Sequence, residues 1–510
     1  MTTPARKSFV IRAGLLSLLF LAAALWPYAV YADLHLQDFP NHLAAAFILL
    51  HPNDPLLQLH YRIDWSIVPD LGWELWVMAL SPLFSPTIIA KIMIVAVLLL
   101  GVGGCFALGR ALTGRWTLVP LIAFPVLLNG ALANGYLSFD FGLALALWAM
   151  AFWAWMPERR WAIRLAVATL AATALYIVHL CSFGIYGIFV LGFELWRFRD
   201  DPAPLRRLGA LARDGVQALP ALIIAVHYAG AGHLAEGAAY AHPWTRFGEV
   251  SLLIESGWPW IDIVVILAYT GFLILSAVKG WLSLSSKVTF ALLIYAALLF
   301  ILPDGLIFGS QLPWRLVLAL VLIGITSMTP TPQTPRPLIP ALLSVALCIT
   351  LAVSLAQNRR WSKSAAEKDA FLSVIAPMPD GSRLFLAHSG FTPSVLTRDE
   401  GGAYHEGAYA VLAKRALVPS LFTAPGQHLL RFRDPVIQDV AQRDSLVFLT
   451  DIEESFSERH ASFGDYLMHF DYAVLHGEDD VLEKRMLPFN QLSLINRVGD
   501  YRLYRIGRAP

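Results

Sequence analysis

Long apolar runs separated by short polar connections constrain this chain more than any other feature. The first two runs cover residues 13–30 and 86–108, and each is long enough for a helix that crosses a bilayer, which needs about 20 apolar residues. Only 15% of the 510 residues are charged, against about 25% in soluble domains, and the mean hydropathy is +0.59. The sequence therefore predicts a polytopic α-helical membrane protein.

Hydropathy predicts about eleven transmembrane helices. They cover residues 13–30, 86–108, 117–132, 139–156, 162–178, 181–196, 216–230, 261–279, 287–302, 314–328 and 338–356. If these spans alternate, the basic clusters at 110–115, 158–164, 197–213, 279–287 and Arg336 all fall on one side. The positive-inside rule makes that side cytoplasmic.

This orientation places the N-terminus in the cytoplasm and the outer loop 33–85 on the opposite side. Val30–Ala32 resembles a signal-peptidase site, but the 18-residue run before it is longer than the 7–15 residues of a signal sequence and favours an uncleaved first helix. Within the outer loop, the apolar stretch 73–84 is too short to cross and indicates an interfacial or re-entrant helix.

Charged residues return after residue 357, and short β-rich runs appear at 383–387, 446–449 and 472–475. Residues 492–496 and 501–504 around Gly499 and Asp500 are typical of a closing hairpin. We therefore expect a transmembrane domain over 1–357 and a soluble extracytoplasmic α/β domain over 358–510. No glycine-rich phosphate loop follows any of these runs, which argues against a nucleotide site.

Several partner classes find no support in the sequence. A net charge of +1 argues against a nucleic-acid partner. Cys105, Cys181 and Cys348 form no CxxC pair. His233 and Glu236 have a spacing that a metal ion can use on a helix, but the sequence fixes no third ligand, so no metal site is predicted.

The polar stretch that follows the first apolar run carries the strongest candidates for catalysis, Asp33, Asp38 and His42. Pro40 can open a helix, with Asp38 at its N-terminus, and His42 is four residues beyond Asp38. A carboxylate beside an oriented imidazole suits general-base activation of a hydroxyl. The alternative interpretation is that Asp38 only caps the helix and His42 packs at the membrane interface.

Further polar residues are predicted on the same outer side as candidates for substrate binding. They are Asp140, His179, His242, Asp304, Gln311 and Arg315. Asp140 can instead be a helix cap, Arg315 a snorkelling helix anchor, and His242 a solvated residue of the outer loop 231–260. We expect Asp38, Asp140, His179, Asp304 and Arg315 to converge around one outer cavity.

The layout resembles the GT-C superfamily of membrane glycosyltransferases along the full length of the chain. In that superfamily a first helix precedes a large outer loop with an essential acid, further spans follow, and many members end in a soluble domain. Residues 37–44 are similar to the loop of uncharacterised bacterial members, and Asp38, followed by Asp33, corresponds to the acid. Phe39 and Pro40 stand where many members have a second acid, which argues against metal binding.

The resemblance implies a polyprenyl-phosphate-linked sugar as donor and inverting transfer to a lipid, glycan or protein acceptor on the periplasmic face of a bacterial inner membrane. The sequence identifies no further cofactor and leaves a divalent metal ion open. The acid would act as catalytic base. A lipid-linked donor stays in the bilayer, so its phosphate must meet a cation at the membrane boundary, and Arg315 is the candidate. Two alternatives stay open: a transporter or flippase for lipid-linked saccharide, and a non-catalytic assembly protein for cell-envelope polysaccharide.

Overall fold

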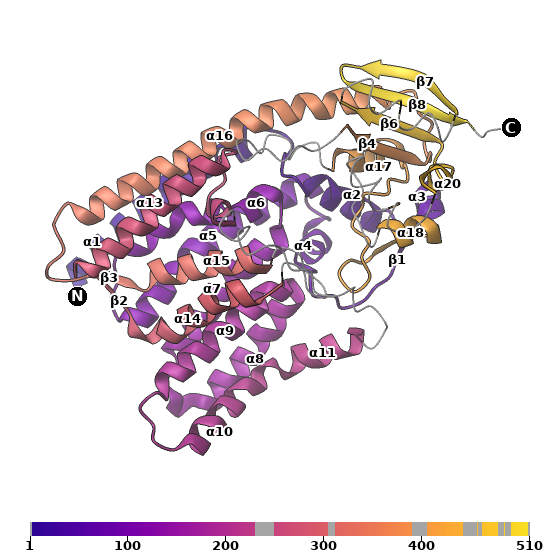
Figure 1. Cartoon of the computed structure of the whole chain (residues 1–510). Helices are drawn as coiled ribbons and strands as arrows, with labels where there is room; N and C mark the ends of the chain where they lie inside the picture. Colours follow the sequence, from indigo (N-terminus) through magenta and orange to yellow (C-terminus); the bar gives the residue numbers. More distant parts are fainter. Residues whose placement is uncertain are drawn as a thin grey trace. The chain divides into compact units, whose positions relative to one another are not determined.

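The structure is a computed structural model of the chain, and it describes residues 3–229, 249–303, 312–389, 405–441, 456, 462–477, 484 and 491–507. The chain divides into two compact units (Figure 1). The first unit consists of residues 1–32, 69–76 and 90–358, and the second of residues 33–68, 77–89 and 359–510. The predicted domain limits of 1–357 and 358–510 stay a prediction.

The first unit is built from helices. Its elements are α1 Thr3–Val30, α5 Pro86–Thr113, η1 Val119–Leu128, α6 Gly130–Asn134, α7 Leu137–Trp155, η2 Glu158–Arg160, α8 Trp161–Val178, α9 Leu180–Arg197, α10 Pro204–Gly215, η3 Val216–Ala218, α11 Leu219–Ala229, η4 Glu249–Leu253, α13 Pro259–Val278, β2 Leu282–Leu284, η5 Ser286–Val288, α14 Thr289–Ile301, α15 Leu312–Thr326, β3 Met328–Pro330 and the first part of α16 Leu338–Val374.

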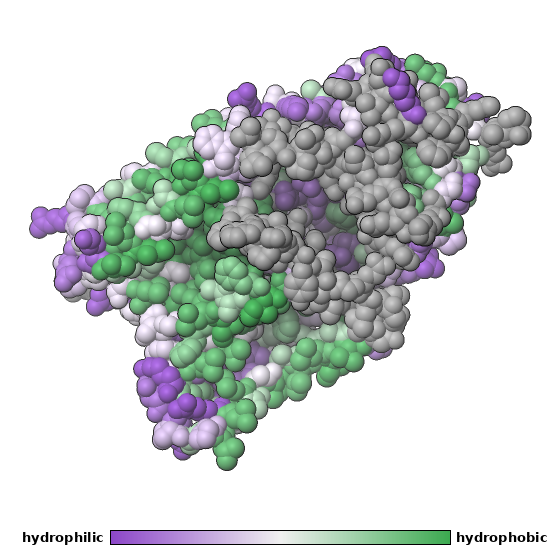
Figure 2. All heavy atoms as spheres, viewed as in Figure 1, coloured by the Kyte–Doolittle hydropathy of each residue, from purple (hydrophilic) through white to green (hydrophobic). Residues whose placement is uncertain are grey.

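The predicted spans coincide with apolar helices. Among the described residues, eight helices are long and apolar enough to cross a membrane. The predicted spans 117–132, 287–302 and 314–328 fall on the shorter apolar helices Val119–Asn134, Ser286–Ile301 and Leu312–Thr326. Large apolar side chains of the long helices, among them Leu15, Leu170 and Ile223, are exposed, and Figure 2 shows green surface over this part of the chain. The chain is a multi-pass membrane protein.

A network of ion pairs joins α8, α9 and α10 at one end of the first unit. Arg164 is fully buried, contacts Glu194 at 2.8 Å between Nη2 and Oε1, and lies 3.6 Å above the ring of Trp153. Arg197 binds both Glu194, at 2.5 Å, and Asp214, at 3.2 Å. The basic residues predicted to share one side of the membrane therefore form one cluster here.

The remaining basic connections reach the same end. Lys287 lies 6.0 Å from the ring centre of Trp196, beside the ion pairs. The Ser285 hydroxyl donates to the carbonyl of Leu112, at the end of α5. Strands β2 and β3 pair antiparallel and bring residues 282–284 against 328–330. Alternating spans require this arrangement, and the cytoplasmic assignment of this end stays a prediction.

The second unit contains a four-stranded sheet and short helices. Its elements are α2 Phe39–Leu50, α3 Pro55–His60, β1 Tyr61–Ile63, β4 Leu384–His388, η6 Glu406–Ala408, α17 Tyr409–Lys414, β5 Leu430–Phe432, α18 Pro435–Ala441, α20 Phe463–Leu467, β6 Tyr472–His476, β7 Gln491–Val498 and β8 Tyr501–Gly507. Helix α4 Gly72–Leu80, predicted over 73–84, runs from the first unit into the second.

The sheet has the order β4-β6-β8-β7, with β4 and β6 parallel and the other neighbours antiparallel (Figure 1). The predicted hairpin is confirmed: β7 and β8 meet around Gly499, whose φ of +56° favours glycine. The predicted strands at 383–387 and 472–475 are also confirmed, whereas 446–449 lies outside the described residues. Strand β1 pairs antiparallel with β5, so residues 61–63 fold together with the C-terminal residues.

Gly192 provides a test of the packing between α9 and α14. A Cβ added there would lie 2.3 Å from the backbone nitrogen of Ala291, so we expect Gly192→Ala to force the two helices apart and to destabilise the protein by about 1–3 kcal/mol. Gly184→Ala on the same helix is the control, because its added Cβ meets no atom within 4 Å. The midpoint of thermal unfolding in detergent should fall only for Gly192→Ala; equal midpoints would refute the close contact.

Candidate functional site

Asp38 is the N-cap residue of α2, as the sequence predicted, but its side chain does not cap the helix. Among the described residues its carboxylate accepts no hydrogen bond from the first turn. Its Oδ1 instead lies 3.4 Å from Nε2 of His405, and the two side chains are only 10% and 3% exposed. The structure thus places a shielded carboxylate against an imidazole, which the simple capping role does not require.

Three histidines surround Phe422 next to this pair. The ring of His42 meets Phe422 edge-on at 5.8 Å, His405 does so at 5.1 Å, and His428 stacks on it at 5.3 Å. Asn41 donates to the carbonyl of Ser420 and so fixes the start of α2 against this segment. His42 was a predicted site residue, whereas no spacing in the sequence pointed to His405 or Phe422.

Burial, together with the neighbouring His42 and Arg431, lowers the pKa of His428 to about 3. The imidazole is therefore neutral at physiological pH. The ring that stacks on Phe422 beside the Asp38–His405 pair thus carries no charge.

Asp33, the second candidate acid, forms an ion pair with Lys368 on α16. The ammonium group of Lys368 also lies 4.9 Å from the ring centre of Tyr409. An ion pair of this kind suits a structural role, because it joins the loop after α1 to α16. Its catalytic assignment stays a prediction.

Arg315, in the first unit, lies in the first turn of α15 with its side chain turned into the protein. Its Nη1 lies 3.1 Å from Nε2 of His179 and 3.3 Å from Sγ of Cys181. The guanidinium carbon is 5.0 Å from the ring centre of Tyr136 and 5.1 Å from that of Phe139. An anchor that snorkels to water would be exposed, but Arg315 is 7% exposed.

The described part of the chain supplies Arg315 with few partners. No carboxylate of the described residues lies within 4 Å of its guanidinium, and its Nε has no hydrogen-bond partner among them. His179 is also shared, because its Nδ1 lies 3.1 Å from the amide nitrogen of Cys181. A neutral imidazole accepts at only one nitrogen, so His179 serves either that amide or Arg315.

Asp140 lies in the first turn of α7, where the sequence placed it. Its Oδ1 accepts a hydrogen bond from Nδ2 of Asn129 at 3.1 Å, while its buried Oδ2 has no partner among the described residues. Asn129 in turn caps α6 through its own side-chain oxygen. Asp140 therefore offers one buried acceptor atom, which a bare helix cap would not leave unused.

The predicted convergence can be followed for three residues. Asp140, His179 and Arg315 gather around Phe139, since its ring contacts His179 at 5.3 Å and the Arg315 guanidinium. Asp38 belongs to the second unit, so its approach to these residues stays a prediction. Gln311, Asp304, His242, His233 and Glu236 lie outside the described residues.

The second unit holds one group of potential metal ligands that the sequence analysis missed, His388, Glu406 and His476. One ligand atom from each lies within 4.8 Å of the others. The sequence did contain a signal for this group, because His388 and His476 directly follow the predicted strands 383–387 and 472–475. Because the carboxyl ends of parallel neighbours meet at one sheet edge, the parallel pairing of β4 and β6 brings them together.

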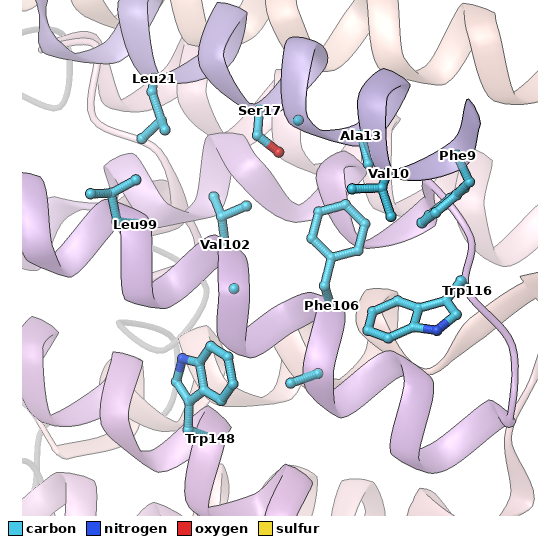
Figure 3. A pocket seen from close by; sticks show the side chains of 13 residues that line it. Phe9, Val10, Ala13, Ser17, Leu21, Leu99, Val102, Phe106, Trp116 and Trp148 are labelled. Carbon is cyan, nitrogen blue, oxygen red and sulfur yellow. The ribbon is translucent and has the colours of Figure 1, made fainter. Parts of the chain in front are cut away.

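An apolar cavity of about 490 Å³ lies between α1 and α5 (Figure 3). Its lining consists of Phe9, Val10, Ala13, Gly14, Ser17, Leu21, Leu99, Val102, Gly103, Phe106, Ala107, Trp116 and Trp148. The indole N–H of Trp148 is already donated to the carbonyl of Leu100. With no titratable side chain in its lining, this cavity suits hydrocarbon and not acid–base chemistry.

No family model matches the sequence, and no curated protein does. The structure is similar to the crystal structure of ArnT from Cupriavidus metallidurans in the apo state, with a TM-score of 0.52 over 98% of this chain and 98% of that one, at 10% sequence identity. The chain has an ArnT-like fold. This likeness confirms the predicted fold of transmembrane helices with a small C-terminal α/β region.

The lowered pKa of His428 predicts how stability depends on pH. In the unfolded chain the imidazole binds a proton below about pH 6.5, whereas the folded protein keeps it neutral down to about pH 3. The stabilisation that the neutral His428 gives to the folded state is therefore complete above pH 6.5. As the pH falls below 6.5, the free energy of unfolding decreases by about 1.4 kcal/mol per pH unit. His428→Gln should flatten the pH dependence of the unfolding midpoint between pH 6.5 and 5.

The neighbouring substitution Gln427→Ala is the control for this measurement, because it removes no titratable group. It should leave the slope against pH as in the native chain. Identical slopes for His428→Gln and the native chain would contradict the assignment of a buried neutral imidazole.

Proposed function

We propose that this protein is an integral-membrane glycosyltransferase that moves a sugar from a polyprenyl-phosphate donor to a lipid, glycan or protein acceptor. The observation that carries the proposal is the Arg315 guanidinium, which is buried among aromatic rings and has no carboxylate of the described residues within 4 Å. The likeness to ArnT, a GT-C glycosyltransferase, supports the same class of reaction.

A buried cation that lacks a fixed counterion is costly, and an anionic ligand removes that cost. A phosphate group suits the geometry, since a planar guanidinium can donate two parallel hydrogen bonds to phosphate oxygens. Arg315 keeps its Nε for such a contact, while His179 and the rings hold the planar group in place. The lipid chain of the donor would remain in the bilayer.

Asp38 is the proposed catalytic base. In an inverting transfer, the acceptor oxygen or nitrogen attacks the anomeric carbon of the sugar, the bond from that carbon to the phosphate oxygen breaks, and polyprenyl phosphate leaves with the bond electrons. The Asp38 carboxylate takes the proton that the acceptor loses. His405, 3.4 Å away, orients the carboxylate and keeps it in place.

We further propose that the basic end of the first unit faces the cytoplasm of a bacterial inner membrane, with the N-terminus on that side and the C-terminal residues in the periplasm. The clustering of Arg164, Arg197 and Arg213 at one end supports this orientation under the positive-inside rule. The acceptor would then be a periplasmic lipid, glycan or protein.

Two substitutions test the proposed roles separately in nanodiscs that contain polyprenyl-phosphate-linked sugars, with an extract of cell-envelope lipids and glycans as acceptor. Asp38→Asn should lower kcat about 10²–10⁴-fold, because the proton acceptor is lost. Arg315→Gln should instead raise the Kd for undecaprenyl phosphate at least about 30-fold, because the phosphate loses its buried partner. Release of polyprenyl phosphate and its binding are both measured by mass spectrometry.

The matched controls are Asp380→Asn, an exposed carboxylate of the second unit, and Arg110→Gln, an exposed arginine of the first unit. Both should behave as the native chain. Full turnover by Asp38→Asn would remove the proposed base. Movement of the lipid-linked sugar across a liposome bilayer without any release of polyprenyl phosphate would favour the flippase. The absence of both transfer and movement would favour an assembly protein.

A further inference from the structure

Three ring-bearing side chains form one row across the sheet of the second unit. The register of β4, β6 and β8 places His388 opposite His476 and His476 opposite Tyr501. Directly opposed residues on neighbouring strands point to the same face of a sheet. His388, His476 and Tyr501 therefore share one face, and Arg502, the next residue on β8, points to the other face.

Glu406 covers this row from the 3₁₀ turn η6. Its Oε2 accepts a hydrogen bond of 2.7 Å from the Tyr501 hydroxyl. Its Oε1 lies 3.9 Å from Nε2 of His388 and 3.9 Å from Nδ1 of His476. The Glu406 side chain is 2% exposed, and Oε1 has no hydrogen-bond partner among the described residues. Tyr501 thus holds one carboxylate oxygen and leaves the other directed at the two imidazoles.

We propose that His388, Glu406 and His476 form a binding site for a divalent transition-metal ion of the zinc class. Two imidazoles and one carboxylate are a common ligand set for such ions, in which an open coordination position is filled by water or a ligand. This site goes beyond the proposed glycosyl transfer and does not depend on it. It also differs from the helical His233–Glu236 pair considered in the sequence, because its ligands come from three separate segments.

The distances fit one ion after a small adjustment. Metal–ligand bonds of about 2.0–2.2 Å place two donor atoms about 3.3 Å apart in a tetrahedral site. An imidazole binds one ion through a single ring nitrogen, and Nε2 of His388 and Nδ1 of His476 each lie 3.9 Å from Oε1 of Glu406. One ligand atom from each of the three residues lies within 4.8 Å of the others. The carboxylate would have to approach each imidazole by about half an ångström, which side-chain rotation can supply.

Neighbouring contacts hold the ligands in orientation. Tyr501 stacks on His476 with ring centres 4.0 Å apart and planes inclined by 6°, and it donates to Glu406. Such outer contacts tune metal affinity in known sites. Gly477 has a φ of +117°, and a Cβ there would lie 1.8 Å from Oγ of Ser389, so only glycine lets the ends of β4 and β6 come so close.

A bound dication would neutralise the buried carboxylate of Glu406 and would bind imidazole nitrogens that carry no proton. The His476 side chain is 21% exposed, which gives an ion a route to the ligands.

The site also lies next to the residue that contacts Asp38. His405 directly precedes Glu406, and its Nε2 is 3.4 Å from the Asp38 carboxylate. An ion that fixes Glu406 would therefore also fix the start of η6 and, through the chain, the position of His405.

The test uses the full-length protein in detergent, purified without a polyhistidine tag and freed of metal by a chelator. We expect one Co²⁺ ion per chain, with visible absorption bands typical of a four-coordinate site, and one Zn²⁺ ion that displaces it. Glu406→Gln and His476→Asn should each weaken binding at least about 100-fold, and Tyr501→Phe about 10–100-fold because the ligands stay but lose their orienting contact. Ion content is measured by mass spectrometry.

His51→Asn removes an exposed histidine of the same unit and is the matched control, which should bind as the native chain does. Size-exclusion profiles show whether each variant is folded, and Tyr501→Phe retains all three ligands if Glu406→Gln does not fold. The proposal is overturned if the native chain binds no Co²⁺ or Zn²⁺. It is equally overturned if folded His476→Asn and Tyr501→Phe bind these ions as tightly as His51→Asn.

Discussion

At one end of the first unit, several helices pack around the buried guanidinium group of Arg315. Aromatic rings from Tyr136, Phe139 and Trp314 cover the planar group, and His179 contacts its edge. Backbone hydrogen bonds from Leu71 to Ile177 and from Leu180 to Pro69 close the surrounding segments. Stretches that are distant in sequence thus meet around one cation, where α8 ends and α7, α9 and α15 begin.

The opposite end of the same unit shows what a structural arginine looks like in this protein. Arg164 is as deeply buried as Arg315, but Glu194 binds it directly and Arg197 and Asp214 complete the network. A buried ion pair of this kind is complete without a ligand. Arg315 contacts aromatic rings and an imidazole, and among the described residues it forms no direct ion pair, since Asp70 and Asp140 act on it only from beyond 4 Å. The contrast between the two arginines supports a ligand-binding role for Arg315.

Hydropathy and local turn chemistry were sufficient to predict the helices of the first unit and the β7–β8 hairpin. Both depend on contacts that are short in sequence or on the lipid environment itself. The pairing of Asp33 with Lys368 and of Asp38 with His405 could not be predicted, because each joins the loop after α1 to a residue more than 300 positions later in the chain. The His388–His476 pair was accessible from the sequence, since two predicted strands end at these residues.

The role of Asp38 is clarified by a second aspartate in the same unit. Asp54 is the N-cap residue of α3, and its Oδ1 accepts hydrogen bonds from the amides of Leu56 and Leu57. Pro55 follows it directly, and a residue before proline is held in the extended region, where the carboxylate reaches the first turn; Asp54 has ψ 118°.

Asp38 and Asp54 differ in the residue that follows them in the sequence. Phe39 stands between Asp38 and Pro40, so Asp38 is released from that restriction and takes a helical ψ of −8°. In this conformation the carboxylate turns away from the helix amides and toward His405. An aspartate needed only to start a helix would gain stability from the arrangement of Asp54. With Phe39 between Asp38 and Pro40, α2 therefore lacks a side-chain cap, and the buried Asp38 carboxylate faces the imidazole of His405.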